Sequence, residues 1–170
     1  MEQWEIYDRA GNPTGKIVNK KDGLGKNEYH LAVEIWVIND AGEILLQQRS
    51  ASVELLPGLW GLTTGRVQAG ETSLQAAVRE LQEEMGILLS EDALQFIERI
   101  PRDDETHLIW DIFVAYQEIP IETVHIQKEE VAAARYVTPK EFSHMIKKGE
   151  IYEYPEIHRL LAMLTKKELT

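Results

Sequence analysis

The sequence predicts an α/β domain in which a few helices pack on a mixed or mostly antiparallel β-sheet. Short segments rich in β-branched and aromatic residues alternate with turn sequences along much of the chain, which is typical of strands joined by hairpins. Three other segments have the apolar spacing or start signals of helices. Because 170 residues, 44% hydrophobic and 28% charged, are enough to bury one continuous core, we expect a single domain over residues 1–170.

The strands are expected mainly in three hairpins. Residues 1–28 form an N-terminal extension in which the turn at 10–15 separates two short extended runs between Trp4 and Val18. The other predicted strands are Leu31–Ile38 with Glu43–Gln48, Leu94–Arg102 with His107–Gln117, and a short one at Arg135–Val137.

The first predicted helix, Thr72 to Met85, has apolar residues at helical spacing and therefore one buried face. Thr72 and Gln75 have the spacing of a capping box, and Gly86 suits the position just beyond the helix. A second helix begins at Thr138, with Pro139 in its first turn, and a third runs from about Pro155 to Lys167. The predicted architecture is therefore a layered domain.

Composition excludes several classes of function. The net charge of −11 argues against binding a long nucleic acid, which requires a basic surface. The absence of cysteine removes thiolate chemistry and disulfides, and no apolar run is long enough to span a membrane. The first residues lack the features of a secretory signal, so we expect a soluble, cytoplasmic protein. A small phosphorylated substrate is compatible with this charge if a metal cation lies between it and the protein.

Three glutamates on the first helix indicate such a metal site. Glu80, Glu83 and Glu84 stand at offsets of zero, three and four, so their carboxylates gather on one side of the helix and repel one another. No lysine lies between Lys26 and Lys128 to dilute this charge. Magnesium prefers carboxylate oxygens and retains open positions for water or phosphate. Arg79 can hold one carboxylate in place through paired hydrogen bonds.

The surrounding motif resembles a complete Nudix box over residues 65–87. Gly65 is followed after five residues by Glu71 and after seven more by the run Arg79-Glu80-Leu81-Gln82-Glu83-Glu84-Met85-Gly86-Ile87. The resemblance implies a Nudix-type α/β/α sandwich. It also implies a pyrophosphohydrolase that binds Mg²⁺ or Mn²⁺ and cleaves a small diphosphate compound, of the nucleoside-diphosphate type, with water.

The resemblance also implies roles for individual residues. Glu80, Glu83 and Glu84 would bind the metal together with the backbone carbonyl of Thr64 or Gly65. Arg79 would orient a carboxylate, and Glu71 would brace the loop. A carboxylate outside the box would take the proton from water, and Glu130 is the candidate, with Glu129 next.

The chain further resembles the Nudix branch that contains isopentenyl-diphosphate isomerase. That enzyme uses a cysteine just before the box glycine and a histidine just after it, whereas this chain has Thr64 and Arg66. Hydrolysis is therefore favoured. The alternatives are an isomerase-like protein with altered chemistry and a diphosphate-binding domain without turnover.

Several other residues that could have a function are expected to have structural roles. Four aromatic side chains are expected in the core rather than stacked on a base: Trp110, Phe113, Tyr152 and Tyr154. His30 and His107 are taken as structural residues. The sequence does not identify the group attached to the diphosphate, and the N-terminal hairpin offers an edge for a homodimer.

Overall fold

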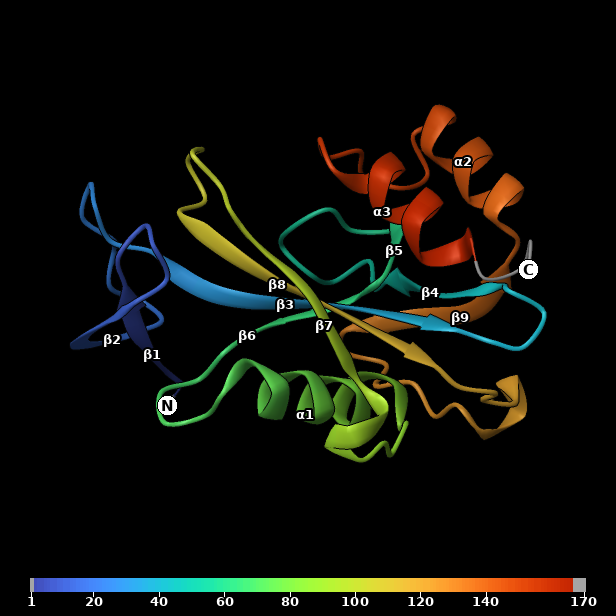
Figure 1. The fold of residues 1–170 in the computed structure, drawn as a ribbon, viewed down its shortest axis with the longest axis horizontal. Coiled ribbons are helices and arrows are strands. Elements are labelled where there is room, and N and C mark those ends of the chain that lie inside the picture. The colour runs from blue at the N-terminus through green and yellow to red at the C-terminus, as the bar shows by residue number, and fades with distance from the viewer. Residues whose placement is uncertain (1, 167–170) are drawn as a thin grey trace.

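The computed structural model describes residues 2–166, which form a mixed sheet between two helical layers and a separate hairpin at one end (Figure 1). The predicted end of the last helix, Lys167, lies outside the described residues. Within the described residues, no helix is long and apolar enough to cross a membrane.

The main sheet has seven strands around a long central one, β3. Their order is β5-β4-β3-β8-β7, with β6 also paired to β3 and β9 to β4. β3 runs parallel to β8, and the other pairs are antiparallel. The strands are β3 (His30–Ile38), β4 (Ile44–Arg49), β5 (Trp60–Gly61), β6 (Thr63–Arg66), β7 (Gln95–Pro101), β8 (Leu108–Tyr116) and β9 (Val131–Val137).

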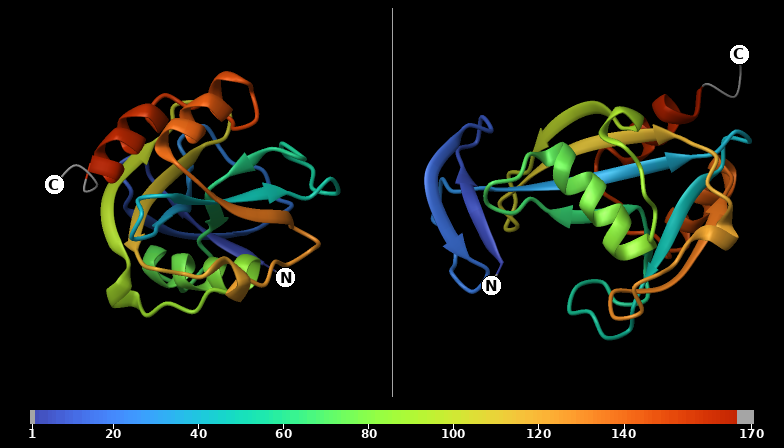
Figure 2. Two further views of the ribbon diagram at one scale, coloured as in Figure 1. Left: turned by 90° about the vertical axis from the view of Figure 1, so that its right-hand side faces the viewer. Right: turned by 90° about the horizontal axis from the view of Figure 1, so that it is seen from below.

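The helices cover both faces of this sheet (Figures 1 and 2). α1 (Ser73–Met85) packs on one face, while α2 (Pro139–Lys147) and α3 (Ile157–Thr165) pack on the other. Short 3₁₀ turns occupy Glu91–Ala93 and Ile121–Thr123. Every residue of β3 is buried, because its alternating side chains enter two different cores. This is the expected α/β/α sandwich.

The N-terminal hairpin forms its own two-stranded sheet from β1 (Gln3–Tyr7) and β2 (Pro13–Asn19), as predicted. It has a small core of Trp4, Ile6 and Val18. A bridge between Tyr7 and Tyr29 joins it to the start of β3. The hairpin therefore lies beside the main sheet as an attached unit.

Two strand predictions needed correction. The predicted pair Leu31–Ile38 and Glu43–Gln48 touches only at its turn, where Ile38 pairs with Ile44, because β3 takes β8 and β6 as its main partners. The strand predicted at Arg135–Val137 begins earlier, at Val131. Three successive alanines, which have low strand propensity, concealed this start.

The core assignment of the aromatic residues was correct for three of four. Phe113 is buried, and Trp110 and Tyr154 pack half-buried against the core. The prediction was wrong for Tyr152, whose exposure is 57%. Only the preceding Ile151 pairs with the sheet, through an isolated bridge to Trp60, so no strand turns Tyr152 inward.

Candidate metal centre

The candidate site lies where β6 leads through a loop into α1. Both predicted signals at the helix ends are present: Thr72 and Gln75 form a reciprocal capping box, and Gly86 adopts the left-handed conformation with φ of 65°. These ends fix which residues face the sheet. The buried face of α1 includes Leu81 and Met85, and it also includes the polar residue Glu80.

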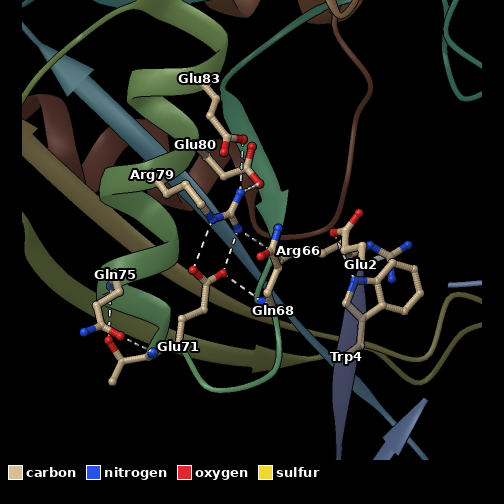
Figure 3. A network of polar contacts seen from close by, with 10 residues as sticks. Glu2, Trp4, Arg66, Gln68, Glu71, Gln75, Arg79, Glu80 and Glu83 are labelled. Carbon is tan, nitrogen blue, oxygen red and sulfur yellow. Dashed lines mark hydrogen bonds and ion pairs between the residues drawn. The ribbon is translucent and has the colours of Figure 1, made fainter. Parts of the chain in front are cut away.

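Arg79 is the centre of the polar network (Figure 3). Its Nη1 donates to Glu80 at 2.8 Å and to Glu83 at 3.2 Å. Its Nε and Nη2 donate to the two carboxylate oxygens of Glu71, at 3.1 and 2.7 Å. Nη2 also donates to the backbone carbonyl of Arg66 at 2.9 Å. One guanidinium thus joins the helix, the loop and β6.

Glu71 closes the loop between β6 and α1. Besides accepting two hydrogen bonds from Arg79, its Oε1 accepts one from the backbone amide of Gln68 at 2.7 Å. The structure therefore places Glu71 where it holds the loop against Arg79.

The three helix glutamates differ in environment. Glu80 is buried, with 9% exposure, and burial raises its pKa to about 7 despite the adjacent Arg79. Glu84 is half-buried, and burial raises its pKa to about 8. Glu83 is exposed. A recess of about 510 Å³ lies beside it and reaches Arg79.

The donor atoms of the cluster are of the kind that a hard divalent cation prefers. Glu80 passes so close beneath Gly65 that a Cβ atom there would lie 2.1 Å from its carboxyl carbon, so only glycine leaves this space. Three carboxylates supply the oxygen ligands that Mg²⁺ and Mn²⁺ prefer. In residues 2–166 no three acidic or histidine groups converge on one point, because Arg79 holds Glu80 and Gln47 holds Glu84.

Comparison with known proteins decides the family. The NUDIX domain model matches residues 28–160, which is most of the chain. The chain belongs to the Nudix family. An uncharacterised Nudix hydrolase of Listeria monocytogenes is 32% identical over 163 residues, covering 94% of each chain. An isopentenyl-diphosphate Delta-isomerase of Photorhabdus laumondii is 26% identical over 162 residues, covering 91% of this chain and 90% of that enzyme. The predicted relationship to the isomerase branch is therefore confirmed.

Solved structures support the Nudix fold. A protein from Deinococcus radiodurans aligns with a TM-score of 0.73 at 18% identity, covering 96% of this chain and 99% of that one. The Nudix domain of Shewanella oneidensis NrtR, solved in complex with ADP ribose, aligns with a TM-score of 0.62 at 17% identity, covering 90% and 94%.

The carboxylates predicted outside the Nudix box lie in the loop before β9. Glu130 is exposed, and its charge contributes to raising the pKa of Glu84. Glu129 accepts a hydrogen bond from Ser52 through its backbone carbonyl. The loop is tied to the Nudix helix by the Gln127 amide, which donates to the Glu84 carbonyl at 2.9 Å.

Sequence analysis gave no role to Gln47 and its partner Thr63, which lie beside the Nudix helix. Gln47 donates to Glu84 at 2.8 Å and accepts from the hydroxyl of Thr63 at 2.9 Å. This buried relay connects β6, β4 and α1. Gln47 follows the apolar run Ile44–Leu46 and points to the same side as Leu45, so a polar residue on a core face was the available signal.

Sequence analysis also gave no role to Arg66, which directly follows the Nudix glycine. Its guanidinium lies 5.0 Å from the centre of the Trp4 ring, beneath which His30 packs edge to face. Burial lowers the pKa of Arg66 from its ordinary value, and the charge of Glu2 opposes this shift. The N-terminal hairpin thus reaches the edge of the Nudix box (Figure 3).

Proposed function

We propose that this chain is a metal-dependent pyrophosphohydrolase that cleaves the diphosphate linkage of a small nucleoside-diphosphate-type compound with water. The observation that supports this most is the Arg79 network, which holds Glu80 beneath Gly65 beside Glu83 and Glu84. When bound there, Mg²⁺ or Mn²⁺ would lower the pKa of water and neutralise phosphate charge.

In this proposal Glu80, Glu83 and Glu84 hold the metal, and Arg79 orients Glu80. The backbone ligand is more consistent with Thr64 than with Gly65. The Val67 amide donates to the Leu31 carbonyl, and Gly65 lies two residues earlier opposite Val33, so its backbone groups also face β3. The carbonyls of the alternate residues face the open edge of β6, as that of Arg66 does toward Arg79.

Glu130 is proposed to accept the proton of the attacking water. It is exposed and ionisable, and its charge acts on Glu84 at the end of the carboxylate row. Glu71 holds the loop so that the Thr64 and Gly65 backbone keeps its place beside Glu80. In this proposal the chain itself supplies both the metal ligands and the base.

The first experiment is a substrate panel with Mg²⁺ or Mn²⁺. It contains ADP-ribose, nucleotide sugars, dinucleoside polyphosphates and isopentenyl diphosphate, and products are separated by chromatography. We expect nucleotide or phosphate products from at least one nucleotide compound. Conversion of isopentenyl diphosphate to its dimethylallyl isomer without hydrolysis of any compound would favour the isomerase alternative, since one isomerase aligns with 91% of this chain.

The second experiment replaces the metal-binding carboxylates. Glu83→Gln and Glu84→Gln each keep the side-chain shape but remove one negative charge, so we expect kcat to fall by about 100-fold or more. Glu122→Gln makes the same change on an exposed residue of the second 3₁₀ turn and should leave kcat unchanged. Full activity in both helix variants would refute the proposed metal centre.

A further inference from the structure

The segment of the chain that contains the Nudix box has few cations that could meet the phosphates of a substrate. Between Lys26 and Lys128 the only basic side chains, apart from histidines, are five arginines. Three of them form ion pairs: Arg79 with its glutamates, Arg99 with Asp111 and Arg102 with Glu156. Arg49 donates a hydrogen bond to the Leu55 carbonyl through its Nε.

Arg66 is the exception. Within residues 2–166 its guanidinium makes no hydrogen bond and no ion pair, although the side chain is half-buried. Its Cζ atom lies over the Trp4 ring, 5.0 Å from the ring centre, and its backbone carbonyl accepts a hydrogen bond from Arg79. The guanidinium is therefore restrained in position while its N–H donors have no hydrogen-bond acceptor among the described residues, and the charge of Glu2 acts on it without forming an ion pair.

The position of Arg66 relates it to the metal centre. Gly65, the residue before it, lies against the carboxylate of Glu80, and among residues 2–166 the strand β6 pairs with β3 alone, which leaves its second edge open. Successive side chains of a strand point to opposite faces, so Arg66 lies across β6 from α1. A ligand at the open edge of β6 can therefore meet the carboxylates from one side and Arg66 from the other.

We propose that Arg66 binds non-bridging oxygens of the substrate's diphosphate, and that Trp4 from the N-terminal hairpin orients its guanidinium. This inference rests on the proposed function, because it assumes a diphosphate at the metal centre. Guanidinium groups bind phosphate through two parallel hydrogen bonds, and an aromatic ring beneath one face leaves its edge free for them. The hairpin is then part of the substrate site.

A purely structural role for Arg66 is the competing explanation. In that case the side chain would only fasten the hairpin to β6, and its removal would lower the melting temperature without changing ligand affinity. Binding must therefore be measured directly, separately from turnover and from stability.

The test uses methylenediphosphonate, a diphosphate analogue that cannot be hydrolysed at its bridge, titrated into the full chain with Mg²⁺ by calorimetry. We expect Arg66→Met to weaken binding at least about tenfold and Arg66→Lys to weaken it less, because lysine keeps the charge but loses the fork. Trp4→Phe should weaken binding by about twofold to fivefold, since the ring remains but attracts the cation less. Arg159→Met, which removes an exposed arginine paired with Glu98 on β7, is the matched control and should bind normally.

Equal affinity of the wild-type chain and Arg66→Met would overturn the inference, as would failure of the wild-type chain to bind the analogue. A lower melting temperature of Arg66→Met with unchanged affinity would assign it the structural role. Binding that depends on Arg66, combined with no hydrolysis of any panel compound, would instead contradict the proposed hydrolase and retain the diphosphate site.

Discussion

The lack of a side chain at Gly65 leaves room for Glu80 in the candidate metal centre. Glu80 occupies the space that a Cβ at this position would fill, with 2.1 Å between that atom and the carboxyl carbon. Neither neighbour can move easily, because Glu80 is on the buried face of α1 and the Gly65 backbone is paired with Val33. The distance between strand and helix is therefore set by this contact.

Gly65→Ala is expected to displace Glu80 and to weaken Mn²⁺ binding by about tenfold or more, with a fall in kcat of about 100-fold. Mn²⁺ affinity is measured by electron paramagnetic resonance, which requires no substrate. Gly61→Ala is the control, because a Cβ there would meet nothing within 4 Å. If Gly65→Ala bound Mn²⁺ as tightly as the control does, the contact with Glu80 would have no role in metal binding.

At the scale of single residues, the sequence predicted those site residues that are brought together by their spacing along one helix. Glu80, Glu83 and Glu84 lie one helical turn apart, so their grouping follows from helix geometry alone. Gln47 and Arg66 were missed because they lie on strands, and their neighbours depend on how β4, β6 and the hairpin are placed in space. Spacing along the chain carries no information on such contacts.

Among the elements, α1 depends on the residue that ends it. Gly86 has φ of 65°, and a Cβ there would lie 2.9 Å from the Cβ and 3.0 Å from the carbonyl of His125. The loop after the second 3₁₀ turn packs tightly here, since the His125 amide donates to the Met85 carbonyl. The end of the helix and the loop leading to Glu130 are thus fixed together.

Gly86→Ala should therefore lower the free energy of unfolding by about 2 kcal/mol, combining left-handed strain with crowding against His125. Gly149→Ala is a matched comparison. Gly149 is also left-handed, with φ of 75°, but a Cβ atom there would meet nothing within 4 Å. Its loss should be about 1 kcal/mol. Urea unfolding measures both values, and equal losses would show that crowding against His125 has no cost.

The elements with strong local signals were predicted well. The capping box at Thr72, and the cap residue Thr138 followed by Pro139, marked the starts of two helices, and turn sequences marked the hairpins. The pairing of β3 with β8 and β6 was not predictable, because register between distant strands is decided by which faces are buried together. The start of β9 was missed for a local reason, its run of alanines.

For the molecule as a whole, the hairpin is attached at several separate points. Arg99 donates to the Gly11 carbonyl and to the buried Asp111, and the Ala69 amide donates to the Gln3 carbonyl. At another contact, Trp4 packs edge to face with His30, whose exposure is 3% and whose Nδ1 has no hydrogen-bond partner among the described residues. We therefore expect protonation of His30 at low pH to weaken the attachment of the hairpin.

Burial lowers the pKa of His30 to about 4, and the nearby charges of Arg66 and His107 act in the same direction. In the unfolded chain His30 has its ordinary pKa of 6.5, so between pH 6.5 and 4 the unfolded chain binds more protons than the folded one. The contribution of neutral, buried His30 to the free energy of unfolding is therefore fully present above pH 6.5 and is lost as the pH falls toward 4. We expect a loss of about 2 kcal/mol between pH 7 and pH 4.5 from this residue.

His30→Gln removes this titration, so the free energy of unfolding of the variant should vary less between pH 7 and pH 4.5 than that of the wild-type chain. Urea unfolding at both values gives the difference, and the carboxylates common to both proteins cancel. An identical pH dependence in the two chains would show that His30 is protonated equally in the folded and unfolded states.

The parallel pairing of β3 with β8 also determines when the centre is complete during synthesis. The core beneath α1 includes Ile109 and Phe113 of β8, so a nascent chain that has released the Nudix box from the ribosome still lacks part of the surface on which α1 packs. Closing a contact between segments so distant in sequence is slow. The three glutamates of α1 are therefore translated before the strand that supports their helix, and we expect the ordered candidate centre to form only after β8 has emerged.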